Sequence, residues 1–94
     1  MVTDREVRHA RWEMNWWGGA EVSYTLQVRG PRPERLLALV KRKRWGETWL
    51  AGVETPNGER ALKRFASPGR ARRYCRQVVL SLPPEQRGER RAGR

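Results

Sequence analysis

Apolar and polar residues alternate along the N-terminal third of the chain, a pattern that predicts half-buried β-strands. In residues 7–17 the side chains of one parity are apolar, namely Ala10, Trp12, Met14 and Trp16. In residues 22–29 the alternation is cleaner, with Val22, Tyr24, Leu26 and Val28 on one side. The glycine pair at residues 18–19 separates the runs and is typical of a hairpin turn. The pattern predicts a tryptophan-rich β-hairpin over residues 7–29.

The length of the hairpin loop decides which side chains share a face, because a slip of one residue turns every side chain over. A two-residue loop pairs Trp16 with Glu21, an apolar residue with a charged one. A three-residue loop that includes Ala20 pairs apolar residues throughout: Trp16 with Val22, Met14 with Tyr24, Trp12 with Leu26 and Ala10 with Val28. We therefore expect the three-residue loop.

Residues 35–45 fit either a helix or a strand. Pro33, Glu34 and the Leu/Ala run are typical of a helix start, and the basic residues followed by Gly46 are typical of a helix end. The strand is favoured because the residues up to 66 form two more alternating runs. Tight turns are expected at Gly46-Glu47 and, with a left-handed Gly58, at residues 56–58. The pattern then predicts a three-stranded antiparallel sheet over residues 35–66.

The C-terminal part of the domain has the pattern of an amphipathic helix over residues 68–82. Ser67 and Pro68 form a strong helix start, with Ser at the N-cap and Pro at the first helical position. Apolar residues then recur at a spacing of three to four, namely Ala71, Tyr74, Cys75, Val78, Val79 and Leu82. Pro83 and Pro84 end the helix, and residues 83–94 have no apolar periodicity, so we expect a disordered basic tail there.

Together these elements predict one α+β domain over residues 1–82, with an antiparallel sheet of about five strands and one helix packed on it. The face toward the helix carries Val40, Trp49, Ala51, Val53, Ala61 and Phe65, with Val53 paired with Ala61 and Trp49 with Phe65. The other face carries Lys41, Lys43, Trp45, Leu50, Arg60, Leu62 and Arg64. Either this basic face is open, or the N-terminal hairpin covers it and Leu37, Leu39, Leu50 and Leu62 form a second core layer.

Charge is distributed unevenly along the 94 residues. Residues 1–30 hold four basic and four acidic side chains, whereas residues 31–94 hold 17 Lys and Arg against 6 Asp and Glu. The second part therefore carries the whole net charge of +11. A field of this strength on a small protein points to a polyanion or to an acidic protein surface as the partner.

The inventory of reactive residues argues against an enzyme. His9 is the single histidine, expected in a strand near the N-terminus, and Cys75 lies on the apolar stripe of the helix as core filler. A single cysteine excludes an intrachain disulfide and a multi-cysteine metal site, and we expect no cofactor. No apolar run approaches the length of a membrane span and no signal-peptide core is present, so a cytoplasmic protein is expected.

Two basic surfaces are candidates for contacting nucleic acid, and DNA is the expected form. On the sheet face the candidates are Lys41, Lys43, Trp45, Arg60 and Arg64, where cations neutralise phosphates and Trp45 stacks on an unpaired base. On the helix the candidates are Arg70, Arg72, Arg73 and Arg76. The arginines of the tail, Arg87, Arg90, Arg91 and Arg94, add nonspecific phosphate contacts.

Residues 47–79 contain W-x-A-x-V, P-N-G, F-A-S and A-x-x-Y-C in this order. This stretch resembles the DNA-binding domains made of a three-stranded sheet and one helix, such as the arm-binding domains of tyrosine integrases and the plant ethylene-response-factor type. The positions that fit are Trp49, Gly58, Phe65, Ser67 and Ala71. The resemblance implies that the sheet face lies in the major groove, with Arg60, Arg64, Lys41 and Lys43 toward the DNA. The tryptophan-rich hairpin has no counterpart in those domains.

The alternative is a protein-binding module without enzymatic activity. An inhibitor or adaptor of the kind that phages and mobile elements encode would dock on an acidic surface of a larger host complex. The neutral, aromatic hairpin is the expected interface with a protein or with a second copy of the chain, through Trp12, Trp16, Trp17 and Tyr24. Burial of these aromatic side chains distinguishes the two hypotheses.

Overall fold

The computed structural model describes residues 2–17, 21–28, 35–43 and 46–88; for Trp16, Trp17, Glu21, Lys43 and Ala61 the description covers the backbone alone. The elements follow in the order α1 (Asp4–His9), β1 (Arg11–Trp17), β2 (Glu21–Val28), β3 (Arg35–Lys43), β4 (Trp49–Thr55), β5 (Gly58–Phe65), α2 (Pro68–Ser81) and the 3-10 turn η1 (Pro84–Gln86). The predicted α+β fold with an antiparallel sheet and a C-terminal helix is confirmed.

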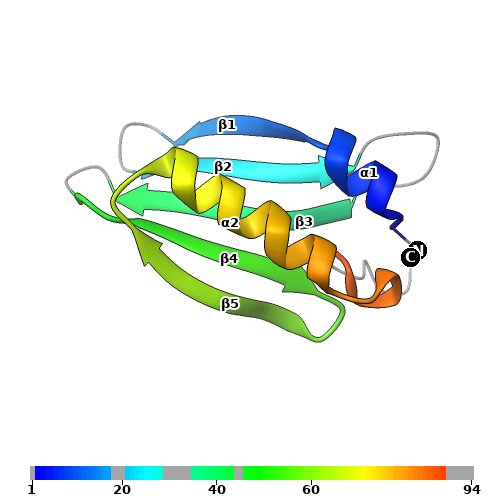
Figure 1. Cartoon of the computed structure of the whole chain (residues 1–94). Coiled ribbons are helices and arrows are strands. Elements are labelled where there is room, and N and C mark those ends of the chain that lie inside the picture. The colour runs from blue at the N-terminus through cyan, green and yellow to red at the C-terminus, as the bar shows by residue number, and fades with distance from the viewer. Residues whose placement is uncertain (1, 18–20, 29–34, 44–45, 89–94) are drawn as a thin grey trace.

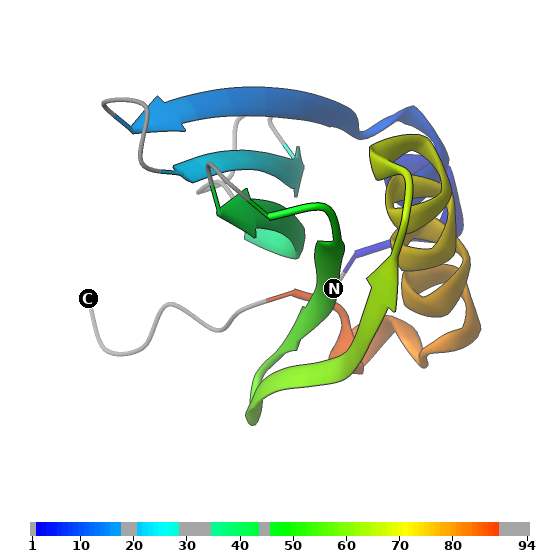
Figure 2. The same cartoon turned by 90° about the vertical axis from the view of Figure 1, so that its left-hand side faces the viewer.

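The strands form one five-stranded antiparallel sheet in the order β1-β2-β3-β4-β5 (Figure 1). Both helices lie on the same side of this sheet, with α2 running obliquely across it (Figure 2). The N-terminal hairpin continues the sheet and does not stack on it, so the hypothesis that the hairpin covers the second face is wrong. In β1 and β2 the expected register is confirmed: Trp16 with Val22, Met14 with Tyr24 and Trp12 with Leu26.

The first strand begins later than expected, because residues 4–9 form α1. Thr3 caps this helix: its side chain accepts a hydrogen bond from the backbone of Glu6, and Glu6 accepts one from the backbone of Thr3, both at 3.1 Å. This capping box satisfies two backbone donors at the helix start. His9 is therefore the last residue of α1, and the expectation of a strand there is wrong.

The segment beginning at residue 35 is a strand, β3, and it pairs with β4 through Lys41 and Leu50. A two-residue turn at Gly46-Glu47 would pair Lys41 with Gly52 instead. The observed register is shifted by two residues, which keeps each side chain on its expected face. The connection includes residues 44–45, which lie outside the described residues.

The β4–β5 hairpin differs from the expected register near its turn. Gly58 has the expected left-handed conformation, with φ of 109°, but it pairs with Thr55, so that the turn itself is Pro56-Asn57. A bulge between Ala51 and Val53 then restores the expected pairing of Trp49 with Phe65. As a consequence Val53 pairs with Arg60, and the predicted pairing of Val53 with Ala61 is wrong.

Helix α2 supplies the main cover of the core. Its start at Ser67 and Pro68 is confirmed, and the Ser67 hydroxyl accepts a hydrogen bond from the backbone N–H of Arg70 at 3.4 Å. The predicted stripe faces the sheet, with Ala71, Cys75 and Val79 fully buried. Beneath the helix, the Trp49 ring packs against Tyr24 with centroids 5.6 Å apart.

Arg87 joins the C-terminal segment to the rest of the domain, and the side chain is only 2 % exposed. Its guanidinium donates hydrogen bonds to carbonyl oxygens near the end of α2 and to Val2, namely those of Val79, Leu80, Leu82 and Val2, at 2.9–3.1 Å. It also forms an ion pair with Asp4 at 2.6 Å. The expectation of disorder from residue 83 is therefore wrong for residues 83–88, because Arg87 ties this segment to carbonyls at the end of α2 and to Val2. Residues 89–94, with Arg90, Arg91 and Arg94, lie outside the described residues.

Candidate nucleic-acid interface

The outer side of α2 is a cationic surface without a carboxylate. Between Pro68 and Ser81 there are four arginines and no acidic residue. Because Ala71, Cys75 and Val79 fix the buried side, Arg70 and Arg73 are exposed, and Arg72 and Arg76 lie half-buried at the flank. We call these four residues, Arg70, Arg72, Arg73 and Arg76, the helix surface.

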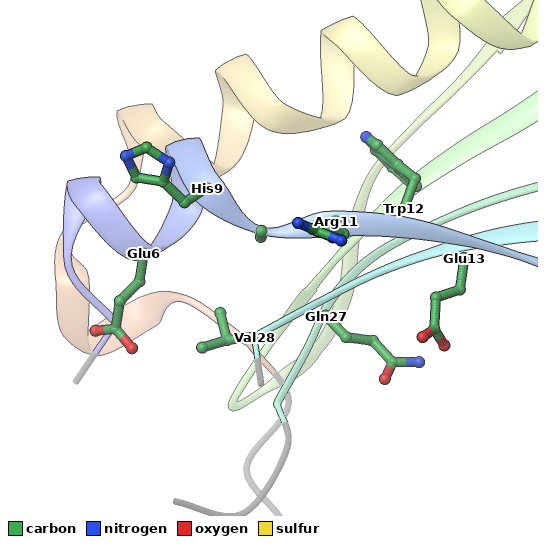
Figure 3. Close-up of a pocket in the computed structure, with 8 residues that line it drawn as sticks. Glu6, His9, Arg11, Trp12, Glu13, Gln27 and Val28 are labelled. Carbon is green, nitrogen blue, oxygen red and sulfur yellow. The ribbon is translucent and has the colours of Figure 1, made fainter. Parts of the chain in front are cut away.

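A pocket of about 390 Å³ lies at the flank of α2 toward β1. It is lined by Trp12, Arg72, Arg73, Arg76, Gln77 and Leu80, and we call it the arginine pocket. Trp12 reaches it because this residue pairs with Leu26, whose side chain is buried on the helix side of the sheet. Figure 3 shows the Trp12 side chain pointing from β1 toward α2, whereas Glu13 and Gln27 point to the other side.

Two arginines of this pocket are held in position by their neighbours. The Arg72 guanidinium lies over the Tyr24 ring, 4.5 Å from its centroid. Arg76 donates a hydrogen bond from Nη2 to the carbonyl oxygen of Ala10 at 2.6 Å. A guanidinium has five N–H donors, so each of these contacts leaves donors that can bind an anion.

On the opposite face of the sheet, the structure brings together only part of the basic residues that the sequence analysis placed there. Lys41 and Arg64 both pair with Leu50 and share this face. Arg60 pairs with Val53, a core residue of the helix side, so its expected place beside Arg64 is wrong; the bulge in β4–β5 is the cause. Lys43 ends β3 with its side chain outside the description, and Trp45 lies outside the described residues.

This sheet face also carries acidic residues, which reduce its positive potential. Glu13 lies on this face because it pairs with Thr25, which in turn pairs with Leu39. Glu54 and Glu59 pair with each other. The Glu59 side chain lies over Gly52, where an added Cβ would collide with it. Among the described residues, carboxylates therefore share the sheet face with Lys41 and Arg64, whereas α2 carries none.

A second pocket, of about 590 Å³, lies on the outer side of β1 near α1 (Figure 3). Two carboxylates and one arginine are among the residues that line it: Glu6, His9, Ala10, Arg11, Trp12, Glu13, Gln27 and Val28. Trp12 lines both pockets. Of these two pockets, the arginine pocket has three arginines and no carboxylate beside the aromatic ring.

One cation that the sequence analysis did not select lies on the helix side. Lys63 pairs with Ala51, and its ammonium lies over the rings of Phe65 and Tyr74, 5.6 and 5.3 Å from their centroids. The alternation of β5 alone puts Lys63 with the helix-facing residues, and the aromatic neighbours account for its position.

Of the aromatic residues proposed as a protein interface, the structure describes the side chains of Trp12 and Tyr24. Trp12 and Tyr24 are half-buried and pack against the core on the helix side. Met14, on the edge strand β1, is the most exposed large apolar side chain among the described residues, at 62 %. The side chains of Trp16 and Trp17 are not described.

Cys75 is buried in the core, whereas His9 lies at the surface. Burial raises the pKa of the Cys75 thiol to about 12, and a backbone hydrogen bond with Gly52 lowers it in part. A thiol with so high a pKa is a poor nucleophile at neutral pH. His9 is exposed at the end of α1. Within the described ranges no group of three or more potential metal-ligating side chains is gathered.

In the part of the chain that the structure describes, neither helix has the length and hydropathy needed to cross a bilayer. No protein-family model, no curated protein and no solved structure matches the sequence or the fold of this chain.

Proposed function

We propose that this protein binds nucleic acid through the helix surface. The observation that carries the proposal is the uniform charge of α2, which bears Arg70, Arg72, Arg73 and Arg76 and no carboxylate. Arginine donates paired hydrogen bonds to phosphate oxygens, and it releases the counterions that surround the polyanion. The net charge of +11 increases the rate of encounter with such a ligand.

The spacing of the arginines suits a phosphate chain. From Arg70 to Arg76 the helix rises about 9 Å, at 1.5 Å per residue. Phosphates of one strand repeat about every 3.4 Å along a nucleic-acid axis. The helix surface can therefore contact two or three successive phosphates without a change in its backbone.

The helix surface is a better candidate than the sheet face. In the DNA-binding domains that residues 47–79 resemble, the face opposite the helix lies against DNA. Here that face carries Glu13, Glu54 and Glu59 beside Lys41 and Arg64, and like charges of carboxylate and phosphate repel. The proposal therefore departs from the mode that the resemblance implies.

Two double variants with equal loss of charge test the proposal. Arg70→Gln with Arg73→Gln removes two cations from the helix surface, and Lys41→Gln with Arg64→Gln removes two from the sheet face. Fluorescence anisotropy measures binding of random-sequence DNA and RNA, single-stranded and duplex, between about 50 and 200 mM salt. We expect the first variant to lower the salt slope by about two and the second to leave it near the wild-type value.

Equal losses in the two variants would show that net charge alone matters and would remove the helix surface as a specific site. A larger loss in the sheet-face variant would restore the mode that the resemblance implies. Absence of binding by the wild-type protein at the lowest salt would reject nucleic acid as the partner. Capture of an acidic host protein would then support the alternative of an inhibitor or adaptor.

A further inference from the structure

We infer that the arginine pocket holds one unpaired base together with its adjoining phosphate, so that the preferred ligand is single-stranded nucleic acid. This inference rests on the proposed function and adds the form of the ligand. It depends on the pocket between α2 and β1, which Arg73 lines and Arg70 does not.

The lining of the pocket has the two chemical parts that a nucleotide needs. The Trp12 ring offers an aromatic surface on which a base stacks regardless of its identity. Arg72, Arg73 and Arg76 supply donors for a phosphate, and Gln77 supplies both a donor and an acceptor for a base edge. No carboxylate is among the six lining residues, and the volume of about 390 Å³ lies in the range of small-molecule sites.

The pocket is organised before any ligand binds. Tyr24 supports the Arg72 guanidinium at 4.5 Å, and the Ala10 carbonyl holds Arg76 at 2.6 Å. Trp12 is itself packed against the core. Fixed groups lose little conformational entropy on binding, so the contacts that they make contribute more of their energy to affinity.

The form of the ligand follows from the position of Trp12. In a duplex the base faces are stacked on one another, so a base must be flipped out before it can lie on Trp12, which costs a few kcal/mol. A single strand presents its bases at little cost. The arginines of the helix surface contact the backbone of either form, whereas stacking on Trp12 requires an unpaired base, so Trp12 discriminates between the two forms.

The test measures the affinities of the full-length protein for a labelled single-stranded oligonucleotide and for the same sequence as a duplex, in DNA and in RNA. We expect tighter binding of the single strand. Trp12→Leu should weaken single-strand binding at least about fivefold, the lower end of the contribution of one stacked base, and should leave duplex binding nearly unchanged. Trp12→Phe, which keeps an aromatic ring, should recover part of the loss.

Arg73→Gln and Arg64→Gln form the matched pair of controls, because each removes one exposed arginine. The first lines the pocket and should weaken binding of both forms, whereas the second lies on the opposite face of the sheet and should change neither. Circular dichroism and thermal melting of each variant confirm that the domain remains folded.

A second measurement is independent of any variant's stability. A single strand that carries 5-iodouracil is irradiated with the wild-type protein, and the cross-linked residue is identified by mass spectrometry. A cross-link at Trp12 supports the inference. Cross-links confined to other aromatic residues, or equal affinity for single strand and duplex, overturn it while the salt-dependent binding still supports the proposed function.

The DNA and RNA arms distinguish the two sources of an unpaired base. Equal affinity indicates that stacking and phosphate contacts alone are used, and higher affinity for RNA indicates a contact with the 2′-hydroxyl. Either result is consistent with the pocket as the base site. Failure of the protein to bind any of these ligands rejects both the inference and the proposed function.

Discussion

Arg87 and Arg73 are both arginines, but their surroundings differ in burial and in hydrogen-bond partners. Arg73 lies on the outer side of α2, exposed to solvent and next to other cations. Arg87 lies beyond the end of the same helix, is 2 % exposed, and donates to four backbone carbonyls as well as to Asp4. One arginine is available to a ligand, and the other is fully used by its own chain.

The comparison teaches that positive charge in a sequence does not by itself indicate a ligand. The carbonyls at the C-terminus of a helix need donors, and a planar guanidinium can satisfy several of them at once. When the chain turns back at Pro83 and Pro84, Arg87 is brought to those carbonyls. An arginine count therefore overestimates the cations that remain available to a ligand.

The largest expected effect is the loss of stability on replacing Arg87. Arg87→Ala leaves carbonyls of the α2 end and of Val2 without a donor and removes the ion pair with Asp4, so we expect a loss of about 3–5 kcal/mol in the free energy of unfolding. Urea denaturation measures it. Arg87→Lys serves as a control for charge, because an ammonium cannot reproduce the planar fork; wild-type stability in that variant would contradict the role given to the guanidinium.

A smaller effect, on a different property, is expected at the helix surface. Arg73→Gln should leave the free energy of unfolding within about 0.5 kcal/mol of the wild type, as for most surface changes. It should lower the slope of log affinity for nucleic acid against log salt concentration by about one. If Arg73→Gln unfolds the domain and Arg87→Ala does not, the assignment of the two arginines is reversed.

Replacement of Asp4, the ion-pair partner of Arg87, should have a smaller effect on stability than replacement of Arg87. The Asp4 side chain is 61 % exposed, so water and salt compensate for much of its charge. We expect Asp4→Asn to cost about 1 kcal/mol, which includes the favourable interaction of an acidic residue with the start of α1. The difference from the wild type should shrink in high salt. A loss as large as that of Arg87→Ala would mean that the ion pair, and not the carbonyl contacts, carries the stability.

An effect that is absent at neutral pH concerns the buried side of α2. The pKa of the Cys75 thiol rises to about 12 in the folded protein, so the folded state keeps its proton at a pH where the unfolded chain has lost it. Stability due to this thiol is therefore complete below pH 9, the ordinary value, and declines as the pH rises from 9 toward 12. Denaturation of the wild type and of Cys75→Ala across this range should show a steeper decline in the wild type. Parallel curves would mean that the thiol is accessible to water.

Much of the fold follows from patterns that involve neighbours along the chain. The alternation in residues 11–28 fixes the first hairpin and its register, and Ser67-Pro68 fixes the start of α2. Helix α1 also had a signal, since Thr3 and Glu6 have the spacing of a capping box. Residues 7–9 also fit the alternation of the strand that follows, because so short a run fits the helix period and the strand period equally.

Other features depend on contacts that no local pattern specifies. The bulge between Ala51 and Val53 moves Arg60 to the other face, at the place where Glu59 and Leu62 lie over Gly52. The arginine pocket requires that both hairpins belong to one continuous sheet, which brings Trp12 beside α2. The sequence indicated the basic residues of the helix but not the aromatic residue that stands with them.

The contact between Arg87 and Val2 spans 85 positions of the chain. The strands, in contrast, follow one another in the sheet, so that most of the structure is built from pairings between successive segments. We expect successive pairings to form early because little loop entropy opposes them, and the ends of the chain to meet after the sheet and α2 are in place. We therefore expect replacement of Arg87 to speed unfolding more than it slows folding.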